Sequence, residues 1–255
     1  MNSQAKPSTP SRSTNLFLET VKGLLSTALV AVLAATLFTA WPATGAGANR
    51  PSPAEGAEAN SALENQASNQ DFHIGLVVGH WGHDVGAICP DSLGGHREVD
   101  INYTVADLTR QFLQAEGIQV DLLKEFDNQL EDYQANALIS VHADTCEYIP
   151  ENGSGFKIAE TVENKRPEQA ARLLACLENR YAAATGLRKD TRLTADMTLY
   201  HAFNEISGET PGVIIETGFM NQDRELLTKH PELVARGITE GVLCFLNREE
   251  ISPDG

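Results

Sequence analysis

Apolar and polar positions follow two different periodicities along residues 72–248, and together they predict strands that alternate with helices. Short runs that are apolar or loosely alternating, as in buried strands, occupy residues 74–78, 118–123, 137–141, 155–159 and 213–215. Apolar residues at helical spacing predict helices over residues 98–116, 130–135, 167–185, 223–227 and 233–247. Gly117 and Gly186 mark the ends of two of these helices. This order of elements predicts an α/β fold with helices on both faces of a sheet.

The first 71 residues have a different pattern, which predicts export from the cytoplasm. Residues 1–22 are polar and Ser-rich, whereas residues 23–41 carry no charge and consist largely of Leu, Ala and Val. This apolar stretch approaches the ~20 residues that a membrane-spanning helix needs, and Ala46-Gly47-Ala48 offers a cleavage site for a signal peptide. The stretch is therefore a retained signal anchor, a cleaved signal peptide or, as a third alternative, a buried core helix. Positive charges precede it, so residues 1–22 should stay cytoplasmic, and residues 42–71 should form a disordered linker.

Charge excludes two classes of partner for the folded part. The formal net charge is −16 and the sequence has no basic stripe. Nucleic-acid binding is excluded, because phosphate contacts need clustered Lys and Arg. Adhesion of the folded domain to anionic lipid is disfavoured for the same reason. Membrane contact is expected only through residues 23–41, and the chain is expected to be a monomer.

Two histidines and two glutamates indicate a catalytic metal site. His80, His142 and Glu216 each end a short apolar run, the expected place for site residues in an open α/β sheet. The two histidines and Glu98 form a sufficient ligand set for a zinc ion with an open position. Zinc lowers the pKa of a bound water to about 7 and polarises a carbonyl. Glu216 could then move the proton from this water to a leaving nitrogen.

Each of these residues also has an ordinary alternative role. A histidine at a strand end is more often a hydrogen-bonded polar residue than a metal ligand. Glu98 could be favoured at the start of a helix by the helix dipole, and Glu216 could be a salt-bridge partner. Three glycines between residues 79 and 86 favour the metal site, because they permit a tight loop and close backbone approach beside His80.

Four segments around these residues resemble, in the same order, the motifs of the zinc-dependent N-acetylmuramoyl-L-alanine amidases of type 3. They are Gly79-His80-Trp81-Gly82-His83-Asp84-Val85-Gly86-Ala87, Glu98-Val99-Asp100-Ile101-Asn102, Ser140-Val141-His142-Ala143-Asp144 and Glu216-Thr217-Gly218-Phe219. The resemblance covers residues 72–248 and implies that His80, Glu98 and His142 bind zinc and that Glu216 is the catalytic acid/base. It also implies a twisted, mainly parallel sheet of about six strands with helices on both faces.

The chain departs from the family pattern beside the first histidine. Val77-Val78 stands where the family usually has Asp-Pro, and Trp81 replaces a small residue. Trp81 could stack on a sugar ring or merely cover the loop, while His83 and His96 are either extra donors near the metal or solvated loop residues. Residues 145–154 are too few to carry an autoinhibitory helix, so we expect an open groove.

The four cysteines lie in no Cys-x-x-Cys pair, which argues against a structural zinc cluster. Export permits disulfides. Cys89 and Cys146 each follow one of the histidine segments, so a Cys89–Cys146 disulfide is expected if both segments surround one metal. The alternative is four free thiols, with Cys176 and Cys244 packed as small hydrophobic residues on helices.

The sequence thus predicts an exported zinc-dependent peptidoglycan hydrolase that cleaves the amide between N-acetylmuramic acid and the L-alanine of the stem peptide. Two alternatives remain open. One is a peptidoglycan-binding or regulatory module that keeps the fold without catalysis. The other is a zinc peptidase that acts on stem peptides.

Overall fold

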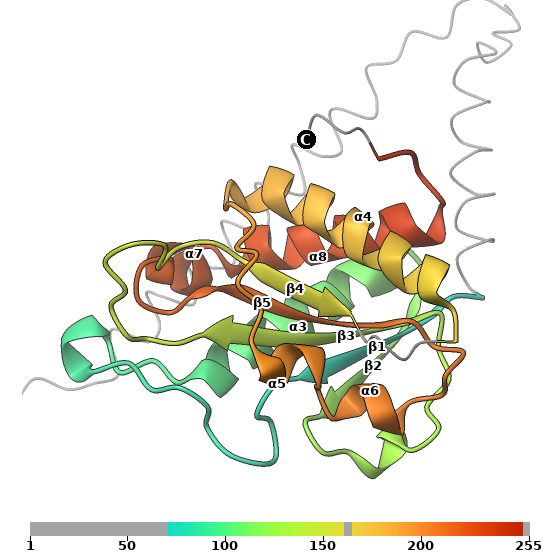
Figure 1. The fold of residues 1–255 in the computed structure, drawn as a ribbon, viewed down its shortest axis with the longest axis horizontal. Coiled ribbons are helices and arrows are strands. Elements are labelled where there is room, and N and C mark those ends of the chain that lie inside the picture. Colours follow the sequence, from blue (N-terminus) through green and yellow to red (C-terminus); the bar gives the residue numbers. More distant parts are fainter. Residues whose placement is uncertain (1–70, 161–164, 252–255) are drawn as a thin grey trace, which may run out of the picture. The chain divides into compact units, whose positions relative to one another are not determined.

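A five-stranded sheet forms the centre of the computed structural model, which describes residues 71–160 and 165–251 (Figure 1). The strand order is β2-β1-β3-β5-β4. The strands are β1 (His73–Val78), β2 (Gln119–Lys124), β3 (Ala137–Asp144), β4 (Lys157–Glu160) and β5 (Gly212–Phe219). All neighbours are parallel except β4, which pairs antiparallel with β5 at the edge. The described residues therefore hold one strand fewer than the family resemblance implied, and the expected α/β class is confirmed.

Two of the strands extend further than the apolar pattern predicts. β3 continues past residue 141 to Asp144, and β5 continues past residue 215 to Phe219. His142 and Glu216 thus lie within strands instead of directly after them. Successive strand side chains point to opposite faces, so His142 and Glu216 share a face of the sheet with Leu138 and Ile214.

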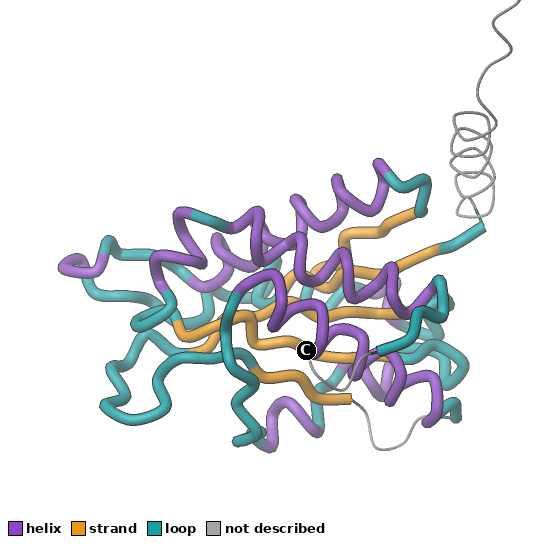
Figure 2. Tube along the Cα trace, turned by 90° about the horizontal axis from the view of Figure 1, so that it is seen from above, coloured by secondary structure: helices purple, strands orange, loops and turns teal. Residues whose placement is uncertain are grey.

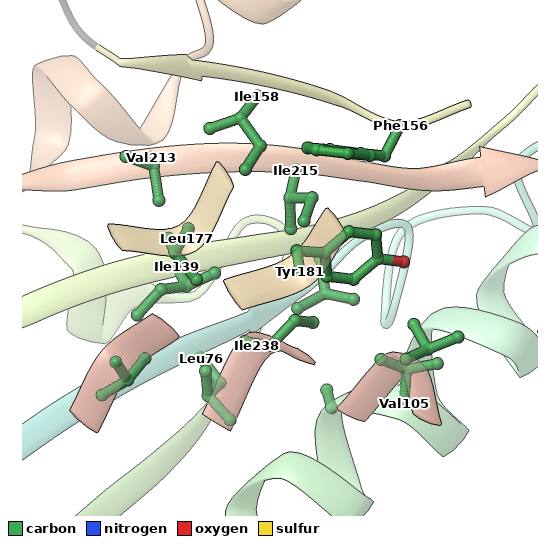
Figure 3. Close-up of a cluster of buried hydrophobic side chains, with 14 of the residues drawn as sticks. Leu76, Val105, Ile139, Phe156, Ile158, Leu177, Tyr181, Val213, Ile215 and Ile238 are labelled. Atoms are coloured by element: carbon green, nitrogen blue, oxygen red, sulfur yellow. The ribbon is translucent and has the colours of Figure 1, made fainter. Parts of the chain in front are cut away.

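Long helices cover one face of the sheet. They are α3 (Glu98–Ala115), α4 (Pro167–Thr185) and α8 (Pro231–Leu246), and α8 packs against both of the others. Figure 2 shows this layer from above, and Figure 3 shows the core beneath it. Buried residues from three strands meet residues of the three helices there: Leu76, Ile139, Ile215, Val105, Leu177, Tyr181 and Ile238. Burying each aliphatic side chain contributes roughly 1.5–3 kcal/mol, so this face supplies most of the packing energy.

A close approach of α4 and α8 sets up a disulfide that the sequence did not reveal. A Cβ on Gly241 of α8 would lie 2.6 Å from the Leu177 side chain and 2.8 Å from the Leu177 Cα, so only glycine permits this spacing. Cys176 and Cys244 are joined across the two helices. The expectation of free thiols at these positions is therefore wrong.

The opposite face is covered by short elements. These are the 3₁₀ turn η2 (Asn128–Leu130) and the four-residue helices α5 (Ala195–Thr198) and α6 (Ala202–Glu205). They pack on the second core cluster, which includes Val77, Leu138, Ile214, Leu130, Met197 and Phe203. The helix expected over residues 130–135 is thus a short 3₁₀ turn that ends at Leu130. Helices on both faces were expected, but the two layers differ greatly in thickness (Figure 1).

Two further elements complete the fold: η1 (Asp91–Leu93), which precedes α3, and α7 (Arg224–Lys229), which precedes α8. The expected segments over residues 1–22, 23–41 and 42–70 lie outside the described residues. Among residues 71–160 and 165–251, every helix is too short or too polar to span a membrane.

Candidate metal centre

His80, Glu98 and His142 come together beside the carboxyl ends of the central strands. Each offers one ligand atom, and these atoms all lie within 4.8 Å of one another. His80 Nε2 is 3.1 Å and His142 Nδ1 is 3.3 Å from the same atom, Glu98 Oε1. Glu98 and His142 are buried, and His80 is partly exposed. Three such atoms around one point, with one side open, form the arrangement of a catalytic metal site.

The loop after β1 holds its histidine in an uncommon conformation. His80 has a φ of 66°, the left-handed region that non-glycine residues rarely adopt and that often marks functional sites. Its Nδ1 faces Asp84 Oδ1 at 2.6 Å, which leaves Nε2 directed toward Glu98. Gly86 follows with a φ of +63°, and a Cβ there would lie 2.5 Å from Glu98 Oε2 and 2.7 Å from His80 Cδ2. The expected need for glycine in this loop is confirmed.

The carboxylate of Glu98 is fixed from several sides. Glu98 is the first residue of α3, and its Oε2 accepts the Ala87 backbone N–H at 3.0 Å. Its Oε1 accepts the Asn102 side-chain amide at 3.2 Å and the Ala143 backbone N–H at 3.3 Å. A carboxylate ligand is often hydrogen-bonded in this way, which holds the oxygen that would bind the metal.

The donor set fits a divalent metal that prefers nitrogen and oxygen ligands. Without a metal, the hydrogen bond to Glu98 raises the pKa of His80 to about 9. Burial alone would raise the pKa of Glu98, but hydrogen bonds from His142 and His80 outweigh it and hold that pKa well below its usual range. The site therefore attracts positive charge, and a cation can replace the protons on the histidines.

Glu216 lies next to this group on β5 and is the register partner of His142. Its Oε2 is buried and has no hydrogen-bond partner among the described residues. Burial raises the pKa of Glu216 to about 7, with the charges of Glu98 and Asp144 acting in the same direction. A carboxyl group with a pKa close to the working pH suits proton transfer.

One cavity of about 500 Å³ is lined by His80, Glu98, His142 and Glu216 together. Its opposite wall comes from the α5–α6 segment and includes Asp196, Met197, Leu199, Tyr200 and His201. Sequence reasoning missed this wall, because four-residue helices give no usable periodicity. It also missed Glu125, a buried carboxylate that lines the same cavity. The signal was available, since Glu125 directly follows β2 as His80 nearly follows β1.

The other aromatic and histidine residues of the motif loops lie away from this cavity in the described structure. Trp81 packs edge-on against Tyr103, with ring centroids 5.4 Å apart, and Lys124 Nζ lies 5.8 Å from its ring centroid. These contacts favour the interpretation of Trp81 as a cover for the loop. His83 contacts Phe126 at a centroid distance of 4.7 Å, and His96 lines a separate surface pocket beside α3.

The Cys89–Cys146 disulfide is confirmed. It joins the loop between His80 and Glu98 to the segment that follows His142. Residues 145–154 form turns without a helix, as expected from their number.

Comparison with known proteins identifies the family. Residues 74–244 match the family model described as N-acetylmuramoyl-L-alanine amidase. The chain belongs to this family. It is accordingly an amidase that acts on peptidoglycan. A search of curated proteins found no match.

Solved structures of the amidase family share the fold. AmiC2 of Nostoc punctiforme is 20% identical with a TM-score of 0.54, over 69% of this chain and 98% of that chain. Ami1 from Mycobacterium smegmatis is 19% identical with a TM-score of 0.56, over 70% of this chain and 98% of that chain. The CwlD amidase from Clostridioides difficile, solved in complex with the GerS lipoprotein, is 20% identical with a TM-score of 0.54, over 70% of this chain and 100% of that chain.

Proposed function

We propose that this amidase is an exported zinc enzyme that cleaves the bond between the lactyl group of N-acetylmuramic acid and the L-alanine of the stem peptide. The observation that carries the proposal is the convergence of His80 Nε2, Glu98 Oε1 and His142 Nδ1. Glu216, with its unpartnered oxygen, lies in the same cavity.

The protein residues divide the chemistry between them. Zinc held by His80, Glu98 and His142 would supply an activated water and polarise the scissile carbonyl. Glu216 accepts a proton at its free Oε2 and returns it to the leaving amide nitrogen. Asp84 fixes the ring of His80 through Nδ1.

We infer that the enzyme works outside the cytoplasmic membrane, where peptidoglycan lies. Two disulfides within the described residues fit an oxidising compartment. Residues 1–22 and 23–41 would provide the export signal, whether the apolar stretch is cleaved or stays as an anchor. We expect residues 72–248 to form the catalytic domain. We also expect the enzyme to be a monomer whose partner is peptidoglycan.

The decisive experiment is mass spectrometry of the products that the full chain, loaded with zinc, releases from purified peptidoglycan. Free stem peptides that begin with L-alanine, together with peptide-free glycan, are the expected products. Cuts within the peptide would instead identify a zinc peptidase. Absence of products from a protein with one zinc per chain would indicate a peptidoglycan-binding or regulatory module.

A further inference from the structure

Glu125 joins three parts of the cavity that are far apart in the sequence. It is 6% exposed and directly follows β2. Its Oε2 accepts the backbone N–H of His80 at 2.6 Å. Its Oε1 accepts the Tyr200 hydroxyl at 2.9 Å and faces His201 Nε2, also at 2.9 Å. One buried carboxylate thus contacts the His80 loop and both aromatic residues of the opposite wall.

The same carboxylate faces the second histidine ligand. His142 Nδ1 points to Glu98 Oε1, the atom around which the three ligand atoms gather. The other ring nitrogen, Nε2, is buried without a hydrogen-bond partner among the described residues and lies 3.5 Å from Glu125 Oε2. If Nδ1 binds the metal, Nε2 carries the proton, and Glu125 Oε2 is the carboxylate that faces it; a carboxylate on this side of a metal-binding histidine favours that tautomer and ring direction.

We propose that Glu125 is a positioning residue that orients both histidine ligands of the metal and ties them to the Tyr200–His201 wall. This proposal rests on the proposed function, because it assumes that His80 and His142 bind zinc. It assigns no proton transfer to Glu125. Its two oxygens are already occupied by donors from His80, Tyr200 and His201, whereas Glu216 Oε2 is free.

Tyr200 and His201 are themselves held by further hydrogen bonds, which restrict the movement of the groups that contact Glu125. His201 Nδ1 faces Glu205 Oε1 at 2.8 Å, so the ring lies between two carboxylates. The Tyr200 hydroxyl also accepts the Ser140 Oγ hydroxyl at 2.8 Å. Ser140 lies two residues before His142 on β3. The contacts of Glu125 through Tyr200 therefore reach the same strand that carries His142.

The test is the metal affinity of Glu125→Gln, measured for zinc by competition with a chromophoric chelator. A glutamine keeps the size of the side chain but cannot accept hydrogen bonds with both of its terminal atoms. Loss of such a supporting group typically weakens metal binding about 10- to 100-fold, and we expect a change in this range. The visible absorption spectrum of the cobalt-substituted protein should also change, because it reports the geometry of the ligands.

Asp121→Asn is the matched control. Asp121 lies on the same strand, β2, but it pairs with His73 and Tyr133 at 2.8 and 3.0 Å, away from the cavity. Its affinity and cobalt spectrum should equal those of the wild type. Equal affinity and an unchanged spectrum in Glu125→Gln would overturn the proposal, as would a lower unfolding temperature with unchanged metal binding.

Tyr200→Phe covers the case in which Glu125→Gln does not fold, because it removes one donor and leaves the carboxylate. We expect a smaller loss of affinity, of several fold, with an altered cobalt spectrum. Wild-type values for Tyr200→Phe would then overturn the proposal. Failure of the wild type to bind zinc at all would instead refute the proposed function, so the two failures are distinguishable.

Discussion

His142 and Glu216 are register partners on the adjacent parallel strands β3 and β5. The Thr217 hydroxyl donates to the His142 carbonyl at 2.8 Å, which fixes the two strands at this point. A candidate metal ligand and the candidate acid/base are thereby held at a fixed spacing by the backbone of the sheet. The relative position of His142 and Glu216 therefore depends little on loops. Substitutions can test the metal-binding role of the one and the proton-transfer role of the other separately.

Glu216→Gln should bind zinc with wild-type stoichiometry and lose most of its turnover. The amide keeps the shape of the side chain but cannot carry the proton, and a general acid/base typically contributes about 10²- to 10⁴-fold in rate. Metal content by elemental analysis and product release from peptidoglycan measure the two effects. Glu225→Gln, an exposed position paired with Lys229, is the control. Near-normal turnover in Glu216→Gln would remove this residue from the mechanism.

Gly86→Ala should abolish metal binding. The new Cβ would lie within 2.7 Å of atoms of both Glu98 and His80, so both side chains must move. Gly186→Ala is a matched control, because Gly186 has a φ of +71° against +63° at Gly86, but no atom lies within 4 Å of its Cβ position. Both variants place an alanine at a positive φ, so the backbone strain should destabilise them to a similar extent. Only Gly86→Ala should lose zinc in equilibrium dialysis. Equal zinc retention in the two variants would contradict this account of the loop.

The metal-free protein should become less stable as the pH rises from about 6.5 to about 9. The pKa of His80 is raised from its ordinary value of 6.5 to about 9 by its hydrogen bond to Glu98. The charged pair therefore stabilises the fold fully below pH 6.5, and this contribution is lost as the pH rises through 9. Thermal unfolding in the presence of a chelator measures the slope. His80→Asn, whose side chain tolerates the left-handed backbone, should lack the part of the pH dependence that comes from protonated His80. Identical slopes for the variant and the wild type would refute the role of His80 in this pH dependence.

The two disulfides should have separable effects. They span 57 and 68 residues, so chain entropy predicts that each stabilises the fold by about 4 kcal/mol. The Cys89→Ser/Cys146→Ser variant should lose stability and also bind zinc more weakly, because that bond joins the two ligand segments. The Cys176→Ser/Cys244→Ser variant should lose stability alone. Denaturant unfolding and zinc competition would show the difference, and weaker zinc binding in both variants would argue against it.

Much of the candidate site could be predicted because its residues sit in local patterns. His80, Glu98, His142 and Glu216 occur in four ordered motifs, and the structure gathers all of them around one cavity. The long helices were predicted to within two residues, since their apolar periodicity runs over many turns. The strand ends were less accurate, because β3 and β5 pair with each other through polar residues beyond their apolar runs.

Other parts of the site depend on tertiary contacts that leave no local signal. Glu125 reads as an ordinary polar residue after a strand until His80, Tyr200 and His201 are placed around it. Cys176 and Cys244 lie on two helices, and only the packing permitted by Gly241 shows that they meet. The α5–α6 wall folds because it caps the second core cluster, not because of its own helical propensity.

The unequal covering of the two sheet faces has a consequence for how such an enzyme can diverge. The three long helices bury the larger core, so most changes on that side reduce the yield of folded protein. The thin side carries few residues in regular structure, yet it forms one wall of the cavity. Substrate preference can therefore change through the exposed residues Asp196 and Leu199, which line the cavity, whereas Met197 and Phe203 of the same segment are buried in the second core cluster. Tyr200 and His201 have less freedom to change, because both contact Glu125, whose other oxygen accepts the backbone N–H of His80.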